Sequence, residues 1–295
     1  MRSTPARRTG SAVRRTLPVL VVVLALLAVW YAAALIVGLP TARALAPPHT
    51  APLGLVGAAL TLDRPLVPAP QQVAATLVAG IAQPITSPRS LIYHAGVTAS
   101  TAVVGFLLAF AVGIALAIGI VNLRVLDRSI MPWIIASQTV PALAVAPMVV
   151  VVLGNMGLTG LIPKALIAAW LSFFPIVTSM VAGLRSPDRI QLDLLRTYSA
   201  GGWDVFRRLR WPASMGFLFP GMKVAATLAV VGAIVAELPT GAQAGLGARL
   251  LGASYYGQTL QLWATLVMAS LLAVVAVAMT DAARAILVRA RGGRL

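Results

Sequence analysis

Long apolar runs constrain the fold of this chain more than any other feature. The first, LPVLVVVLALLAVWYAAALIVG at 17–38, contains no charged residue. A helix needs ~20 apolar residues to cross a bilayer, whereas a barrel strand needs about ten residues of alternating polarity. The runs do not alternate, and only 10% of all residues are charged, against about a quarter in soluble domains. We therefore predict an all-α, polytopic integral membrane protein.

The runs are numerous enough for about six transmembrane helices. They lie at 17–38, 95–121, 131–153, 161–183, 217–237 and 260–281. The third run contains Pro132, Pro141 and Pro147. Proline inside a membrane helix implies a kink, whose freed carbonyl groups need other partners.

Small residues recur at every fourth position of the second run, as Gly105, Ala109, Gly113 and Ala117. In a helix this spacing lines one face. Small side chains let a neighbouring helix approach closely, so we predict a helix-packing seam here.

The charge distribution predicts the topology. The net charge of +16 comes mainly from arginines in short segments between the runs, and such segments stay on the cytoplasmic side. We therefore expect both termini and the segments 122–129 and 185–215 in the cytoplasm. This pattern indicates topology rather than nucleic-acid binding. The basic residues that depart from it are Arg43, Arg64, Arg89, Lys164, Lys223 and Arg249.

The same pattern divides the chain into consecutive parts. They are a basic cytoplasmic tail at 1–16, the first transmembrane helix at 17–38, an external connection with a short helix at 39–91, a membrane core at 92–284 that includes the cytoplasmic loop 185–215, and a basic cytoplasmic tail at 285–295. A cleaved signal peptide is the alternative for the first run, with Ala44 and Ala46 before a cut at Pro47. We prefer a retained helix because the run exceeds the usual signal-peptide core of about 7–15 residues.

Residue types that support catalysis or metal binding do not assemble into any recognisable pattern. Zero cysteines exclude disulfides, thiolate metal sites and cysteine nucleophiles. The sequence shows no nucleophile with a base, no metal-ligand cluster and no G-x-x-x-x-G-K-S/T loop to hold the phosphates of ATP. We expect no catalytic residue, no metal ligand and no bound cofactor, and hence a protein that is not an enzyme.

The segment WDVFRRLRW at 203–211 interrupts the apolar runs with arginines and tryptophans. Val205, Phe206 and Leu209 would share one face of a short helix, and the arginines would spread over the rest. Two interpretations stay open: a helix that docks on another protein, and a basic interfacial helix that lies on anionic lipid.

The wider run DLLRTYSAGGWDVFRRLRWP at 193–212 resembles the EAA loop of ABC-importer membrane subunits, which reads Glu-Ala-Ala, then a glycine, then Ile-x-Leu-Pro. Asp193 falls at the glutamate, and two leucines follow at the alanines. Ser199 falls at the glycine, Leu209 at the isoleucine and Pro212 at the proline, with a tryptophan at the leucine.

Three further stretches, at 127–154, 161–186 and 230–251, are similar to the nitrate, sulfonate and taurine branch of binding-protein-dependent permeases. The resemblance covers about residues 68–290. It implies the fold of a type I ABC importer permease, in which this loop is a coupling helix seated in a groove of a separate ATPase. It also implies a homodimer, two ATPases that hold the ATP and Mg²⁺, an external solute-binding protein and a place in the bacterial cytoplasmic membrane.

Through this resemblance, a set of loop residues is expected to contact the ATPase. They are Asp193, Ser199, Gly201, Gly202, Trp203, Phe206, Arg207, Arg208, Leu209 and Pro212. Because serine replaces the family glycine at 199 and two glycines follow shortly after it, a displaced turn is an open alternative. Asp193 is also shorter than the family glutamate, so a degenerate subunit that does not couple is the second alternative.

Polar residues at membrane depth are candidates for the translocation path, and we name Gln138, Ser172 and Glu237. The alternative for each is a hydrogen bond within or between helices. For Glu237, which in the resembling family also stands beside a Gly-Leu-Gly element such as 245–247, we favour a role at the helix end or in gating. We expect His94 to anchor at the membrane interface and Lys223 to reach the headgroups.

The solute implied by the resemblance is a nitrate, a sulfonate, taurine or a heterocyclic vitamin precursor. An ion-driven secondary transporter is the alternative function. It would predict internal repeats and charged residues buried in the middle of the spans, whereas the basic residues here cluster at the ends of the runs.

Overall fold

The computed structural model describes residues 10–47, 49–238 and 242–290, and every regular element in them is helical. The prediction of an all-α protein is thus confirmed. The elements are α1 (Gly10–Leu45), α2 (Pro52–Ala59), α3 (Pro70–Ile81), α4 (Leu91–Asn122), α5 (Arg124–Ala136), η1 (Ser137–Thr139), α6 (Ala142–Asn155), α7 (Leu161–Arg185), α8 (Arg189–Thr197), α9 (Gly202–Val205), η2 (Phe206–Arg210), α10 (Trp211–Glu237), α11 (Leu246–Tyr255) and α12 (Thr259–Ala290). The predicted tails at 1–16 and 285–295 lie partly outside the described residues.

Two compact units make up the chain, residues 1–79 with 253–264 and residues 80–252 with 265–295. In the first unit, α1 packs on α2 through small residues, because a Cβ atom at Gly38 would lie 3.0 Å from the Ala59 carbonyl oxygen. The Trp30 indole donates a hydrogen bond to the Pro68 carbonyl oxygen over 3.0 Å. Its ring also lies 5.5 Å from that of Trp263.

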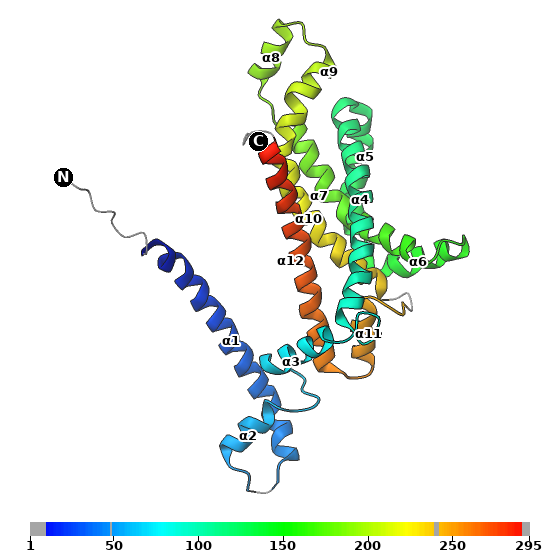
Figure 1. Ribbon diagram of the computed structural model, residues 1–295. Helices are drawn as coiled ribbons and strands as arrows, with labels where there is room; N and C mark the ends of the chain where they lie inside the picture. The colour runs from blue at the N-terminus through cyan, green and yellow to red at the C-terminus, as the bar shows by residue number, and fades with distance from the viewer. Residues whose placement is uncertain (1–9, 48, 239–241, 291–295) are drawn as a thin grey trace, which may run out of the picture. The chain divides into compact units, whose positions relative to one another are not determined.

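The core of the second unit is the packing of α4, α7 and α10 along one another (Figure 1). The predicted seam on α4 is confirmed, since its four small residues are all buried. A Cβ atom at Gly105 would lie 2.6 Å from the Ala168 Cβ, and one at Gly113 would lie 2.8 Å from Ile176 Cγ2. The seam is therefore the contact of α4 with α7.

Five helices are long and apolar enough to cross a membrane: Leu17–Leu45, Leu91–Asn122, Leu161–Arg185, Gly202–Glu237 and Thr259–Ala290. The third predicted span is instead a broken pair, α5 and α6, bent by 104°. The break falls at Pro141, which cannot donate a backbone hydrogen bond, and Val140 before it is extended, as a residue preceding proline prefers. Of the three prolines that predicted a kink, Pro141 is the one at which the break is confirmed.

Figure 1 shows α8 and α9 at one end of the second unit, beyond α7 and α10, and the start of α11 at the other end. We call these the arginine-rich end and the glycine-rich end. α11 lies between the predicted spans 217–237 and 260–281, where the sequence predicted no helix. A second short helix, α2, also lies within the predicted connection at 39–91.

Candidate functional site

The arginine-rich segment, residues 189–210, begins with a well-capped helix. Asp188 and Gln191 form a capping box at the start of α8, in which the Asp188 N–H donates to Gln191 Oε1 over 3.3 Å. Such reciprocal bonds satisfy backbone donors that a helix leaves unpaired at its first turn. Residues next to one another in the sequence thus determine where the first helix of the segment begins.

The turn that ends α8 lies at Ser199. This residue has φ of 52°, in the left-handed region that favours glycine. The Ala200 N–H donates to the Leu195 carbonyl over 3.0 Å, which closes the helix end around the serine. Gly201, by contrast, has φ of −69°. The alternative of a displaced turn is therefore wrong, because the serine itself adopts the conformation.

Beyond this turn, α9 and η2 form the amphipathic helix predicted at 203–211. Val205, Phe206 and Leu209 are half-buried, whereas Arg207 and Arg208 are exposed. The helical interpretation of this stretch is confirmed, with a wider π-helical turn over 206–210.

Aromatic packing connects this helix to the core. The ring of Phe206 lies 5.6 Å from that of Trp203 and 6.0 Å from that of Trp211, and Phe206 also packs against the buried cluster of α4, α7 and α10. Pro212 stands in the first turn of α10, and the residues before it, Phe206–Arg210, are already helical. The segment is therefore continuous with α10.

Large apolar side chains nevertheless remain exposed on the arginine-rich segment. The exposed fractions are 82% for Ile190, 56% for Leu194, 76% for Tyr198 and 71% for Trp203. Its ion pairs join residues three or four positions apart in the sequence, as in Asp193–Arg196 at 3.0 Å. Such exposed pairs contribute little to stability. Exposed apolar side chains gathered in this way are typical of a site that contacts another protein or a membrane.

The candidates for the translocation path do not share one surface. Gln138 is exposed at the break between α5 and α6. Ser172 is fully buried and donates to the Ala168 carbonyl over 2.7 Å, and Glu237 is fully buried as well. Contact of these residues with a solute stays a prediction.

Glu237 lies at the glycine-rich end, inside a hydrogen-bonded cluster. The Thr98 hydroxyl donates to both carboxylate oxygens over 3.0 Å, and the Gly247 N–H donates to Oε2 over 2.8 Å. Thr98 Oγ1 in turn accepts from the Leu246 N–H over 2.8 Å. The carboxylate thus joins α4, α10 and the start of α11.

His94 belongs to the same cluster, so the prediction that it anchors at the interface is wrong. It is only 5% exposed, and its Nδ1 accepts from the Gly245 N–H over 3.0 Å. Because a backbone N–H can only donate, Nε2 carries the proton and donates to the Pro88 carbonyl over 2.8 Å. The sequence pattern missed this role, since His94 and Thr98 are far along the chain from Gly245 and Leu246, whose N–H groups donate to them.

Lys223 also has a partner that the sequence did not show. Its Nζ lies 2.6 Å from Asp281 Oδ1, which connects α10 to α12. The expectation that Lys223 merely reaches the headgroups therefore leaves out an interhelical ion pair.

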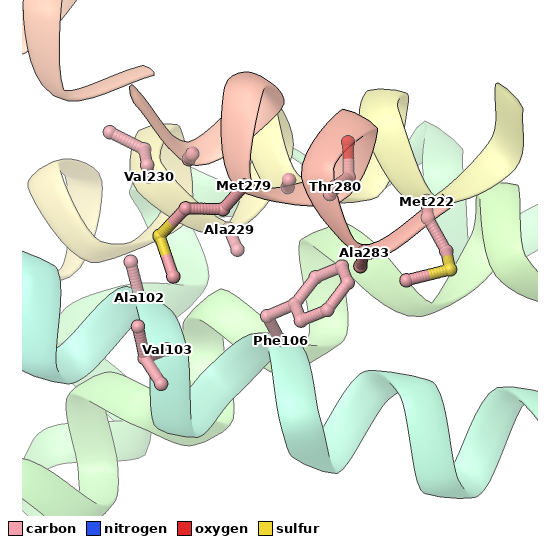
Figure 2. Close-up of a pocket in the computed structure, with 11 residues that line it drawn as sticks. Ala102, Val103, Phe106, Met222, Ala229, Val230, Met279, Thr280 and Ala283 are labelled. Carbon is pink, nitrogen blue, oxygen red and sulfur yellow. The ribbon is translucent and has the colours of Figure 1, made fainter. Parts of the chain in front are cut away.

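Two cavities in the second unit differ in chemistry. One of about 210 Å³ lies between α4, α10 and α12 and is lined almost entirely by apolar groups, among them Phe106, Met222 and Met279 (Figure 2). The other, of about 300 Å³, lies at the start of α7 and includes Lys164 and Thr159. The first offers a polar solute almost no hydrogen bond, whereas the second offers a cation.

Comparison with known proteins identifies the family. Residues 98–292 match the family "Binding-protein-dependent transport system inner membrane component". The chain is 34% identical over 127 residues to the "Riboflavin transport system permease protein RibX" of Chloroflexus aurantiacus, which covers 43% of this chain and 46% of that protein. The chain therefore aligns with less than half of this relative's length.

Two further relatives match longer stretches. The "Formylaminopyrimidine transport permease protein ThiX" of Halalkalibacterium halodurans is 31% identical over 183 residues, 62% of this chain and 68% of that protein. The "Putative aliphatic sulfonates transport permease protein SsuC" of Bacillus subtilis is 25% identical over 174 residues, 59% of this chain and 61% of that protein. With a family match over most of its length and a set of membrane-spanning helices, this chain belongs to the inner membrane components of binding-protein-dependent transport systems.

Proposed function

We propose that this chain is the permease subunit of an ABC importer in a bacterial cytoplasmic membrane, where it moves a small polar solute inward by alternating access. The arginine-rich end lies in the cytoplasm, in accord with the positive-inside rule. A separate ATPase binds the arginine-rich segment and supplies the ATP, the Mg²⁺ and the energy. The chain itself is not an enzyme.

The exposed apolar side chains of the arginine-rich segment carry this proposal. Tyr198 directly follows α8 and Trp203 lies in α9, two short helices beyond α7 and α10 in Figure 1. Both side chains are exposed, and aromatic residues are the usual anchors of protein interfaces. Phe206 fixes the same segment to the core. A displacement of Trp203 by the ATPase would therefore move α10 as well, because the segment is packed against the core and is not a free loop.

The glycine-rich end faces outward in this arrangement and receives an external solute-binding protein. Two copies of the chain form the pathway, as the family resemblance implies. Relatives named for riboflavin, formylaminopyrimidine and aliphatic sulfonates support a small polar solute, and selection among such solutes rests with the binding protein.

A second candidate for the arginine-rich segment is a helix that only lies on anionic lipid. The exposed Arg207 and Arg208 favour it, since basic residues near a membrane surface attract anionic headgroups. It predicts that no ATPase binds and that the segment contributes topology alone.

Co-purification with the ATPase encoded beside this chain separates the two candidates. Trp203→Ala removes an exposed aromatic anchor, and loss of such an anchor costs about 2 kcal/mol or more, so the amount of bound ATPase should fall by at least tenfold at limiting concentration. Trp133→Ala is the matched control, because Trp133 is 77% exposed but lies in α5. It should retain the ATPase.

The monodispersity of each purified variant in detergent shows whether it has kept its fold. If Trp203→Ala is well folded and binds the ATPase as wild type does, the docking surface is assigned wrongly. If no ATPase binds even the wild type, and the arginine-rich segment of the reconstituted chain is protected only in nanodiscs that contain anionic lipid, the lipid-surface candidate holds instead.

A further inference from the structure

The start of α11 is capped by side chains of other helices rather than by its own sequence. The backbone N–H groups of Gly245, Leu246 and Gly247 donate in turn to His94, Thr98 and Glu237. The first turn of a helix leaves its N–H groups without partners inside the helix, and its positive end favours a carboxylate. We call these six residues the α11 clamp.

The glycines of the clamp are required by the space that Glu237 occupies. Gly245 has φ of 122°, which side chains with a Cβ atom rarely adopt, and a Cβ atom there would meet the Glu237 carboxylate. A Cβ atom at Gly247 would meet the Ile234 carbonyl and would lie 2.7 Å from Glu237 Cβ. The backbone of the α11 start and the carboxylate are thus in direct contact.

Burial makes the clamp costly to open. Glu237 and Thr98 are fully buried and His94 is 5% exposed, so separation would remove hydrogen-bond partners from a carboxylate, a hydroxyl and several N–H groups away from water. Buried polar groups in that state are strongly unfavourable, and a charged one most of all. The clamp therefore favours one arrangement of α4, α10 and α11.

α10 connects the α11 clamp at the glycine-rich end to the arginine-rich end of the second unit. It extends as one helix from Trp211 to Glu237, with Pro220 inside it, and is about 40 Å long at 1.5 Å per residue. The arginine-rich segment precedes its first residue directly, and Glu237 is its last. A single helix thus carries the proposed ATPase contact at one end and the α11 clamp at the other.

We propose that Glu237 is a positioning residue whose clamp stays closed throughout transport, so that α4, α10 and α11 move as one rigid body and the outward opening forms elsewhere. This inference rests on the proposed function, since it concerns the transport cycle. It assigns Glu237 to the transmission of movement rather than to contact with the solute.

Hydrogen–deuterium exchange of the 242–252 peptide, in the full chain reconstituted in nanodiscs, tests the clamp. Glu237→Gln should accelerate exchange at the three clamp amides by at least about tenfold, because it removes a charged acceptor. Thr98→Val should do the same, whereas Thr98→Ser keeps the hydroxyl and should retain protection. Ser172→Ala removes an equally buried hydroxyl outside the clamp and should change nothing there.

Packing alone predicts the reverse order for Thr98, because valine keeps the shape of threonine and serine does not. If Thr98→Ser loses protection while Thr98→Val keeps it, hydrogen bonding does not hold α11 and the inference is overturned. Unchanged exchange in Glu237→Gln would overturn it equally.

The closed state is then compared between the permease alone and its complex with the ATPase trapped by ATP and vanadate. Exchange at the clamp amides should agree within about twofold, since a closed clamp protects them in both states. Acceleration of about tenfold in the trapped complex would show that the clamp opens, and the inference would fail while the proposed function stands. Failure of the ATPase to bind at all is scored separately, by co-purification, and would overturn both.

Discussion

Gly105→Ala should loosen the packing of α4 on α7. The added Cβ atom would lie 2.6 Å from the Ala168 Cβ and 2.9 Å from the Ala165 carbonyl oxygen. Carbon atoms pack best at about 3.5–4.0 Å, so the two helices would have to move apart by roughly 1 Å. Backbone atoms of a packed helix cannot swing aside as a flexible side chain can.

The expected loss follows from two opposing terms. Overpacking of a well-filled core costs about 1–3 kcal/mol, and replacement of a helical glycine by alanine returns about 0.5–1 kcal/mol. The net loss is about 1–2 kcal/mol, which lowers the midpoint of thermal unfolding by roughly 2–8 °C in a chain of this size.

Gly96→Ala is the matched control, since Gly96 lies on the same helix and a Cβ atom there meets nothing within 4 Å. Heating of the detergent-solubilised protein, followed by size-exclusion chromatography, measures both midpoints. Gly96→Ala should be neutral or slightly stabilising. A midpoint for Gly105→Ala at or above that of Gly96→Ala would refute the close approach of α4 and α7.

Three other outcomes are expected. Ser199→Gly should stabilise the turn of the arginine-rich segment by ~0.5–1 kcal/mol, because it relieves a serine held at φ of 52°; slower deuterium uptake of the 195–201 peptide would show it, and no change would mean that the turn is not strained. For the Lys223–Asp281 pair, Lys223→Met and Asp281→Asn should each lower the thermal midpoint, and the double variant should lose less than the sum, with a coupling energy of about 0.5–3 kcal/mol; additive losses would show that the pair is not formed. For the topology, Tyr255→Cys should react with a membrane-impermeant maleimide in intact cells, and Tyr198→Cys only after the membrane is opened; reaction of Tyr198→Cys in intact cells would invert the orientation.

The sequence predicts well what depends on local periodicity. Apolar runs predicted the membrane-spanning helices, and the four-residue repeat of small side chains predicted the α4 face that meets α7. Pro141 predicted a break, but the 104° bend there depends on how α6 packs on α7, which no local pattern contains.

The α11 clamp shows why the rest could not be predicted. Thr98 and Glu237 are separated by 139 positions, so only the folded arrangement of α4 and α10 brings them together. The role of the glycines at 245 and 247 was not predicted, because the sequence does not show that a carboxylate occupies the space beside them. A buried polar network between distant helices leaves no periodic signal along the chain.

Ser199 shows a different limit. The family resemblance marked its position as one for glycine, and the two glycines after it suggested that the turn had moved. In the structure the serine takes the left-handed conformation itself, because the hydrogen bonds that close α8 determine the place of the turn. The capping geometry of the helix thus prevails over the preference of a single residue.

Cysteine cross-linking from position 198 tests the proposed ATPase contact most directly. The chain has no cysteine of its own, so Tyr198→Cys introduces a single reactive thiol, and Tyr255→Cys is a control of similar exposure, at 80% against 76%. Membranes that contain the permease and its ATPase are treated with a reagent that joins a thiol to a nearby amine. A covalent permease–ATPase product from position 198 and none from position 255 is the predicted result. Equal yields from both positions, or no product from 198 while the ATPase is bound, would contradict the assignment of the arginine-rich segment as the coupling site.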